Sequence, residues 1–479
     1  MILSVIISFI LKLIIVLLIG LWFYKINKNV IESLVCGWLL MYELQIALML
    51  FFSCFKIMNR WWLGFGLIVI IVMLFLVQRK RIFDALYYLT QRLKEGHQYD
   101  YIIWGGAILL FIYVAAHNFL FFDGTWDAHT YELPRIEFFS QKASLFVNMK
   151  SGALNIFCNE WNGELNGIFY RIMGNENQGI FFSNTENFFY GLFVVWWFAE
   201  KIGINRLGRG ISLLFYCSFP VIVFMSMSSK GDFLAIVLFL CVTIWLKEFL
   251  YSETGYSLLF LAISLGLAAG TKITMVPFAG LCFISICIYF LMKFKVEVKR
   301  YVTLIKKTWK SIVLGVLLSV VGCFRYVLNY IYFGDFFQRV ESVNISFKNI
   351  KSSFLEMLKT ILFPDNAFIH ADIIESLNQD LGIVGFPFII MLLPVVILWC
   401  MMSILREPKR KMDYKILFIL FPTVGSCFFL MASTNWYSWS FRYYTPWICT
   451  LFIVFVLLVQ DIISALPMTC KKLILGAVR

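Results

Sequence analysis

The sequence predicts an all-α polytopic membrane protein with about 11–13 transmembrane helices and a small outer subdomain of amphipathic helices. Three observations lead to this fold class. Hydrophobic residues make up 61% of the 479 positions and charged residues only 14%, whereas a soluble domain carries about 25% charged residues. Apolar runs of about 20 residues, long enough to cross a hydrocarbon core, recur along the chain. Positive charges gather in alternate connections between these runs.

Each apolar run is expected to be a helix, because lipid offers no hydrogen-bond partner to an open backbone. The first run is long, lacks an evident small-residue cleavage site and is followed by further runs, so we interpret it as a retained helix and not a signal peptide. The stretch 349–380 is compatible with a re-entrant or interfacial segment. The expected spans are 3–24, 33–56, 62–77, 102–122, 181–200, 210–228, 232–250, 256–270, 274–292, 311–331, 383–404, 415–432 and 447–465.

Basic residues collect on one predicted side of the membrane, which the positive-inside rule assigns to the cytoplasm. The net charge of +13 is therefore a topology signal. Because that charge is divided among short loops and forms no single face, we expect no nucleic-acid partner. The basic connections comprise residues 79–94, 201–209, 293–310, 406–415 and 471–472.

The long connection 123–180 has the opposite character. It contains seven acidic and four basic residues, and it is predicted to lie on the outer side. Its polar residues alternate with "IEFF" and "FYRIMG", an amphipathic pattern suited to helices that lie at the membrane surface. This connection is therefore the expected outer subdomain.

The twelve cysteines contain no CxxC pair, and most lie inside predicted spans, where a thiol behaves as a small hydrophobe. The four histidines are scattered. We therefore expect neither disulfides nor a cysteine- or histidine-based metal site. No cofactor is predicted with certainty, and a divalent cation held by carboxylate oxygens remains an open alternative.

Four segments in order carry a resemblance to a known family. They are "WDAHTYELPRIEFFSQKASLFVN", "NEWNGELNGIFYRIMG", the run beginning "NTENFFYGLF", and "GLAAGTKITMVPF". Together they resemble membrane glycosyltransferases of the GT-C superfamily, in the branch similar to protein mannosyltransferases and aminoarabinose transferases. In that branch an outer acidic motif of the form WD..TYHLPR opens the catalytic loop. The resemblance covers residues 102–335, with a weaker echo near 436–447.

The resemblance implies a cell-membrane enzyme that passes a sugar from a polyprenyl-phosphate-linked donor to a lipid, glycan or protein acceptor on the extracytoplasmic face. It divides the chain into additional N-terminal transmembrane helices with a cytoplasmic amphipathic segment (1–101), a GT-C-like catalytic core (102–335), and an outer loop with C-terminal helices (336–479). Two departures stand out. Glu132 replaces the histidine common after the motif tyrosine, and "YVLNYIYFGDFFQ" lacks both prolines of a family-like "RNYLLYGNPFYP".

Sugar transfer from a lipid phosphate needs a carboxylate to accept the acceptor proton and cations to hold the departing phosphate. Asp127, at the motif position, is the expected general base, and its alternative role is a helix cap. Asp123 is a second candidate, unless it is only an interfacial charge. Glu132 is a third, because it can orient Arg135 or help bind a cation; otherwise it belongs to a solvated face.

Acceptor or metal binding is predicted for a second group of side chains. Glu160 and Glu164 lie four residues apart and would share a helical face, which suits an acceptor site or a divalent cation with oxygen ligands. His129 is a weaker candidate for the same role. The alternative for all three is exposure on a surface loop.

Donor-phosphate binding is predicted for cations near the outer ends of spans. A buried lysine or arginine at such a depth is costly unless it meets an anion, and Arg325 lies inside the outer end of its predicted span. Arg442 and Tyr443 resemble the RY-x-x-P segment found late in such transferases. The alternatives are snorkelling side chains and an interfacial aromatic belt. The predicted phosphate-binding residues are Arg135, Lys230, Lys272, Arg325, Arg442 and Tyr443.

Two other classes of membrane protein remain as alternatives. A transporter or lipid flippase would place polar groups near the bilayer midplane on broken helices, whereas the candidates above gather at the outer edge. An O-antigen-ligase-like or acyl-transferring enzyme would lack the WD-x-x-TY-x-LPR opening. The absence of GxGxxG and GKS/GKT loops argues against a nucleotide-dependent enzyme.

Overall fold

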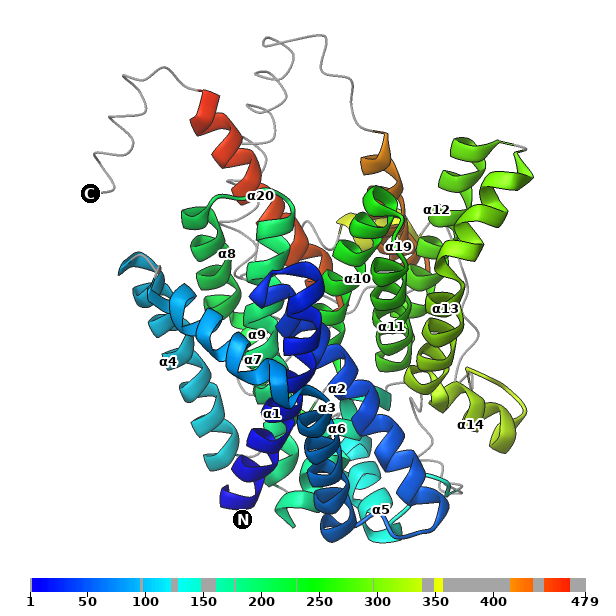
Figure 1. The fold of residues 1–479 in the computed structure, drawn as a ribbon. Coiled ribbons are helices and arrows are strands. Elements are labelled where there is room, and N and C mark those ends of the chain that lie inside the picture. The colour runs from blue at the N-terminus through cyan, green and yellow to red at the C-terminus, as the bar shows by residue number, and fades with distance from the viewer. Residues whose placement is uncertain are drawn as a thin grey trace.

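The computed structural model consists of packed helices, and no strand occurs among the residues it describes (Figure 1). The described residues are 2–94, 98–121, 128–147, 161–175, 178–229, 231–295, 297–337, 349–355, 414–433 and 443–465. The all-α prediction is therefore confirmed for this part of the chain.

The first four helices precede the predicted catalytic loop. They are α1 (Ile2–Asn27), α2 (Val30–Cys54), α3 (Arg60–Lys94) and α4 (Gln98–Leu120). Asn29 caps α2, because its side chain accepts a hydrogen bond of 3.1 Å from the backbone of Glu32, as asparagine commonly does at an N-cap. The α1–α2 hairpin packs closely, and both helices also contact α7. The N-terminal helices are thus part of the same bundle as the rest of the chain.

A short irregular helix, η1 (Ala128–Glu132), leads directly into α5 (Leu133–Lys142), where Pro134 occupies the first turn. Proline fits that position because its missing N–H would be unpaired there in any case. The next helices along the chain are α6 (Trp161–Gly174) and α7 (Gln178–Lys201).

The remaining helices complete the bundle. They are α8 (Arg206–Ser218), α9 (Pro220–Ser226), α10 (Asp232–Ser252), α11 (Gly255–Thr271), α12 (Met275–Phe294), α13 (Val298–Gly322), α14 (Phe324–Phe333), α19 (Lys415–Ser433) and α20 (Thr445–Ala465). α10 is buried along nearly its whole length, so it forms the centre around which the others pack.

Eight helices of the described residues are long and apolar enough to cross a membrane, or nine if α13 and α14, bent by 57°, form one span. These helices define a multi-pass membrane protein. Three more predicted spans are also helical: α7, the α8–α9 pair and the shorter α11. The predicted span 383–404 lies outside the described residues, as does most of 349–380. The predicted total of 11–13 spans therefore stays a prediction.

The helix bounds define two ends of the bundle. The start of α1, together with α5, α6 and α14, lies at one end, and the last turns of α20 lie at the other (Figure 1). The described basic residues at the ends of α7 and α12 lie at the second end. The end that contains α5 and α6 is the one for which the sequence predicts the functional residues.

α6 differs from its prediction as a surface helix. Twelve of its fourteen residues are buried, and it packs against α7, α5, α1 and α11. Glu164, Asn162 and Asn166 make their polar contacts inside the bundle and do not face the membrane surface. Amphipathic periodicity alone could not reveal this, because a helix can bury its polar face when neighbouring helices supply partners.

A polar network fixes α6 within the bundle. Lys12 of α1 forms an ion pair with Glu186 of α7 and donates a hydrogen bond of 2.9 Å to Asn166 of α6. Asn166 in turn donates to Glu186 (3.1 Å) and accepts from Gln45 of α2 (3.2 Å). All four side chains are buried. Four helices are therefore joined by one network in an environment where an uncompensated charge is very costly.

Replacing Lys12 by methionine should destabilise the protein strongly. The Glu186 carboxylate would stay buried without its cation, which costs about 3–5 kcal/mol in comparable cases. The double variant Lys12→Met/Glu186→Gln should recover much of this loss, because no unpaired charge remains. Thermal unfolding of purified protein in detergent measures both, with exposed Lys299→Met as the control. Equal losses in the single and double variants would contradict the role of the ion pair.

Candidate functional site

The structure describes seven of the twelve predicted site residues. Asp123, Asp127, Glu160, Lys230 and Arg442 lie outside the described residues. The described ones are His129, Glu132, Arg135, Glu164, Lys272, Arg325 and Tyr443. His129 is exposed and Tyr443 is half-buried, whereas the other five are buried.

Arg135 and Glu164 form a buried pair between α5 and α6. The Arg135 Nε atom lies 3.1 Å from Glu164 Oε2, and Nη2 contacts Glu164 Oε1. The guanidinium also lies over the ring of Tyr131, 4.9 Å from its centroid. A two-point contact of this kind fixes both the position and the plane of the arginine. One predicted phosphate ligand and one predicted acceptor ligand are therefore brought together.

Glu132 lies beside the turn that precedes α10. Ser229 donates a hydrogen bond of 2.5 Å to Glu132 Oε2, and both residues are buried. The alternative in which Glu132 belongs to a solvated face is therefore wrong. The hydrogen bond fixes the position of this buried carboxyl group, which lies three residues before Arg135 in the predicted motif.

Lys272 links three separate parts of the chain. It follows α11, forms an ion pair with Asp232 in the first turn of α10, and lies 4.4 Å from the ring centroid of Tyr443, just before α20. Lys272 and Asp232 are both buried. Cation–π and ionic contacts of this kind are strong when water is excluded. The predicted phosphate ligands Lys272 and Tyr443, 171 positions apart in the sequence, are thus in contact.

Arg325 lies in the first turn of α14, directly after the bend that ends α13. Its side chain is buried, and its guanidinium lies 4.6 Å from the ring centroid of Trp161 at the start of α6. The first turn of α6 therefore contains Glu164 and also supplies the ring, Trp161, against which Arg325 packs.

Close contacts between the backbones of neighbouring helices bring the charged residues described above to the same end of the bundle. A Cβ on Gly163 would lie 2.6 Å from the Cα of Gly231, and one on Gly270 would overlap the carbonyl oxygen of Gly322. Asn162 clamps the second contact, because its Nδ2 donates to the carbonyls of Leu267 (2.8 Å) and Gly322 (3.0 Å). Each glycine is one to three residues from a charged site residue. The start of α6 therefore lies against the ends of α10, α11 and α13.

Replacing Gly270 by alanine should separate α11 from α13 and weaken the protein. The added methyl group overlaps backbone, which cannot move aside as a flexible side chain can, and we expect a loss of about 1–3 kcal/mol. Gly280→Ala on α12 is the matched control, because nothing lies within 4 Å of its added Cβ. Unfolding midpoints of the two variants in detergent check this, and equal midpoints would contradict the close contact.

Glu137 and Arg171 form a second ion pair between α5 and α6. Arg171 Nε and Nη2 lie 2.6 Å and 2.9 Å from the Glu137 carboxylate oxygens. Partial burial by itself raises the pKa of Glu137, but hydrogen bonds from Arg171 and Gln141 and the charge of Arg171 outweigh it, so that pKa lies below its ordinary value. The pair thus stabilises the fold above the ordinary carboxyl range and is lost as pH falls through the lowered pKa.

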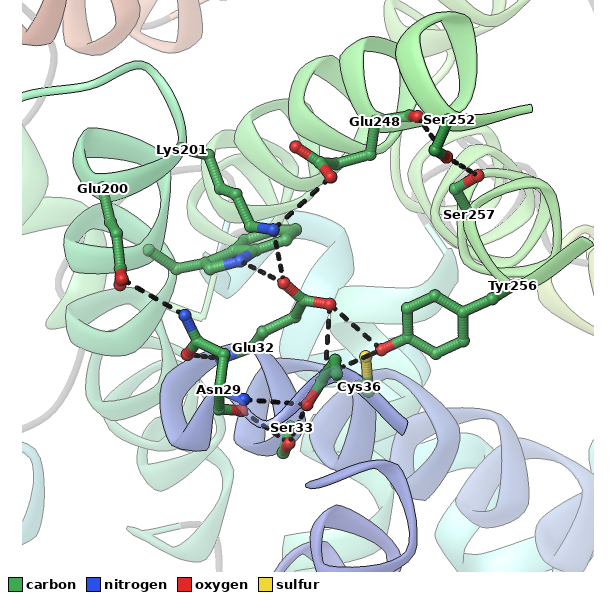
Figure 2. A network of polar contacts seen from close by, with 12 residues as sticks. Asn29, Glu32, Ser33, Cys36, Glu200, Lys201, Glu248, Ser252, Tyr256 and Ser257 are labelled. Carbon is green, nitrogen blue, oxygen red and sulfur yellow. Dashed lines mark hydrogen bonds and ion pairs between the residues drawn. The ribbon is translucent and has the colours of Figure 1, made fainter. Parts of the chain in front are cut away.

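A second polar cluster (Figure 2) lies where α1 ends and α2 begins, at the opposite end of the bundle from α5 and α6 (Figure 1). Glu32 at the start of α2 pairs with Lys201 of α7 at 2.6 Å, and Lys201 also contacts Glu248 of α10. Glu32 accepts further hydrogen bonds from Tyr256 of α11 and Trp197 of α7. Sequence reasoning missed this cluster, although an acidic residue directly before the predicted span 33–56 was a visible signal. Because its hydrogen bonds join four helices, we interpret the cluster as structural.

No group of three or more histidine, cysteine, aspartate or glutamate side chains suited to a metal ion occurs among the described residues. Glu132 and Glu164, the two described carboxylates that the sequence predicted for the site, contact a hydroxyl and a guanidinium. The described cations of the site are held in the same way: Arg135 and Lys272 each pair with a carboxylate, and Arg325 lies over an indole ring.

Fold and geometry define the chain as an all-helical, multi-pass membrane protein with a cluster of buried charges at one end. No family profile, curated protein or solved structure matches it.

Proposed function

We propose that the chain is a glycosyltransferase that takes a sugar from a polyprenyl-phosphate-linked donor and passes it to an acceptor at the extracytoplasmic face of the cell membrane. One observation carries the proposal: the buried cations Lys272 and Arg325 lie at the ends of helices that meet the start of α6, at the same end of the bundle as Glu132 and Arg135. The sequence motif that resembles GT-C enzymes supplies the type of reaction.

In this proposal Lys272 and Arg325 hold the donor phosphate. Asp232 and Trp161 keep these cations in place, so their charge is oriented before the donor arrives, as electrostatic catalysis requires. Tyr443 lies against Lys272 and would contribute to the same phosphate contact. Arg135, held by Glu164, would place the motif segment that precedes α5.

Asp127 would act as the general base, following its motif position. As the acceptor oxygen or nitrogen attacks the anomeric carbon, its proton moves to the Asp127 carboxylate. The bond between the anomeric carbon and the phosphate oxygen breaks, and polyprenyl phosphate leaves with the bonding electrons. Its negative charge is then balanced by the nearby cations.

Asp127→Asn should abolish turnover while leaving donor binding intact, because asparagine keeps the side-chain shape but cannot accept the proton. We expect a loss of about 100-fold or more in rate. The measurement is release of polyprenyl phosphate and appearance of glycosylated product, by mass spectrometry, from a panel of polyprenyl-phosphate-linked pentoses and hexoses. Unchanged turnover with any active donor would reject Asp127 as the base.

Lys272→Gln combined with Asp232→Asn should weaken donor binding about 10- to 100-fold, since a charge-assisted contact is lost while no buried charge is left unpaired. The matched control is Lys293→Gln with Glu253→Gln, which removes an ion pair between α12 and the residue that follows α10, at the opposite end. Equal effects of the two double variants on donor affinity would contradict a phosphate site at Lys272.

A transporter or lipid flippase is the second candidate function. It is favoured by the ion pair between Lys12 and Glu186, which lies well inside α1 and α7, where transporters commonly place polar groups. Proteoliposomes distinguish the two. A transferase forms product in open detergent micelles, whereas a transporter moves lipid or solute only across a sealed bilayer.

A further inference from the structure

Glu43 stands apart from the other buried carboxylates. It lies in the middle of α2 and is 1% exposed. Within the described part of the chain, it alone has both carboxylate oxygens buried and without a hydrogen-bond partner. Glu164 and Glu186, by contrast, each contact a cation. Glu43 belongs to the N-terminal helices, which the resemblance to glycosyltransferases does not cover.

The Glu43 carboxyl group faces the break between α13 and α14. Its Oε1 atom lies 3.1 Å from the position of a Cβ on Gly322, the last residue of α13. The backbone of Gly266 and Leu267 in α11 approaches the same position to within 2.8 Å and 2.9 Å. The C-terminal end of a helix carries partial negative charge, so the end of α13 does not stabilise an anion.

Other titratable groups on the elements around α2 do not supply a positive partner for Glu43. Cys323, at the α13–α14 break, interacts with it electrostatically. Lys12 of α1 is engaged by Glu186, and Tyr256 of α11 by Glu32. Lys201 of α7 pairs with Glu32 and Glu248. The basic residues of α13, from Lys299 to Lys310, are exposed and lie at least twelve positions before Gly322, and Lys25 of α1 and Arg60 of α3 are exposed as well. Further titratable groups on the surrounding elements are Glu164 and Tyr190.

We propose that Glu43 is a proton-binding site in the membrane interior, which holds its proton when the protein is folded. A neutral carboxylic acid is far cheaper to bury than an unpaired carboxylate. Loss of the proton would place an anion beside the C-terminal end of α13 and against Gly322. Proton binding is thereby linked to the packing of the α13–α14 break, which positions Arg325. This inference does not depend on the proposed function.

Labelling with dicyclohexylcarbodiimide in membranes containing the full chain tests the proton directly. The carboxylic acid proton moves to a carbodiimide nitrogen, the carboxyl oxygen bonds to the central carbon, and the O-acylisourea rearranges to a stable N-acylurea, with no atom lost. At neutral pH we expect an adduct on Glu43, none in Glu43→Gln, and none on the ion-paired Glu186. Labelling of Glu186 but not Glu43 would overturn the proposal. It would also be overturned if sodium chloride, but not choline chloride, blocked the labelling of Glu43, because the site would then bind sodium and not a proton.

A second experiment covers the case in which the reagent fails to reach Glu43. The folding stability of the wild type and of Glu43→Gln is measured over a series of pH values. In the unfolded chain a glutamate ionises above about pH 4.3, whereas the proposal keeps Glu43 neutral in the folded protein. The wild type therefore loses stability relative to the glutamine variant as pH rises, and the ratio of their folding equilibrium constants should change about tenfold per pH unit above pH 5. A ratio that is constant from pH 5 to 8 would overturn the proposal.

Discussion

The structure depends on one constraint: a charge buried in a lipid-embedded bundle must meet a partner. Lys12, Arg135 and Lys272 each contact a carboxylate, and Arg325 lies over an indole ring. These partners come from different helices, so the charges determine which helices lie together. The fold and the candidate site therefore have the same physical origin. A change to one charge affects both.

Small residues make these pairings possible. The contacts of Gly163 with Gly231 and of Gly270 with Gly322 bring helix ends together at backbone distance, and the long side chains beside them then reach across. α6 makes more of these contacts than the other described helices of the site. Its first turn provides Trp161 and Glu164, and its middle is held by the network around Asn166. The N-terminal helices thus support the candidate site through α6, which gives them a structural role that the sequence did not indicate.

The sequence predicted the helical class and most described spans, because apolar length is a local property of the chain. It also selected Glu132, Arg135, Glu164, Lys272 and Arg325, all of which are buried at or beside one end. It could not predict their partners, such as Asp232 for Lys272, since pairing depends on how distant segments pack. It missed Lys12, Glu43 and Glu186, although a charged residue inside a predicted span was the available signal. The roles assigned to all twelve site residues, Asp127 and Arg442 among them, remain predictions.

The most direct test of the proposed function is a cryo-electron microscopy structure of the full chain with a polyprenyl-phosphate-linked sugar bound in a lipid nanodisc. The proposal predicts that the phosphate lies against Lys272 and Arg325, with the anomeric carbon within reach of Asp127 and the lipid tail leaving sideways between helices. A phosphate bound at the opposite end, near Glu32 and Lys201, or an anomeric carbon remote from Asp127, would contradict it.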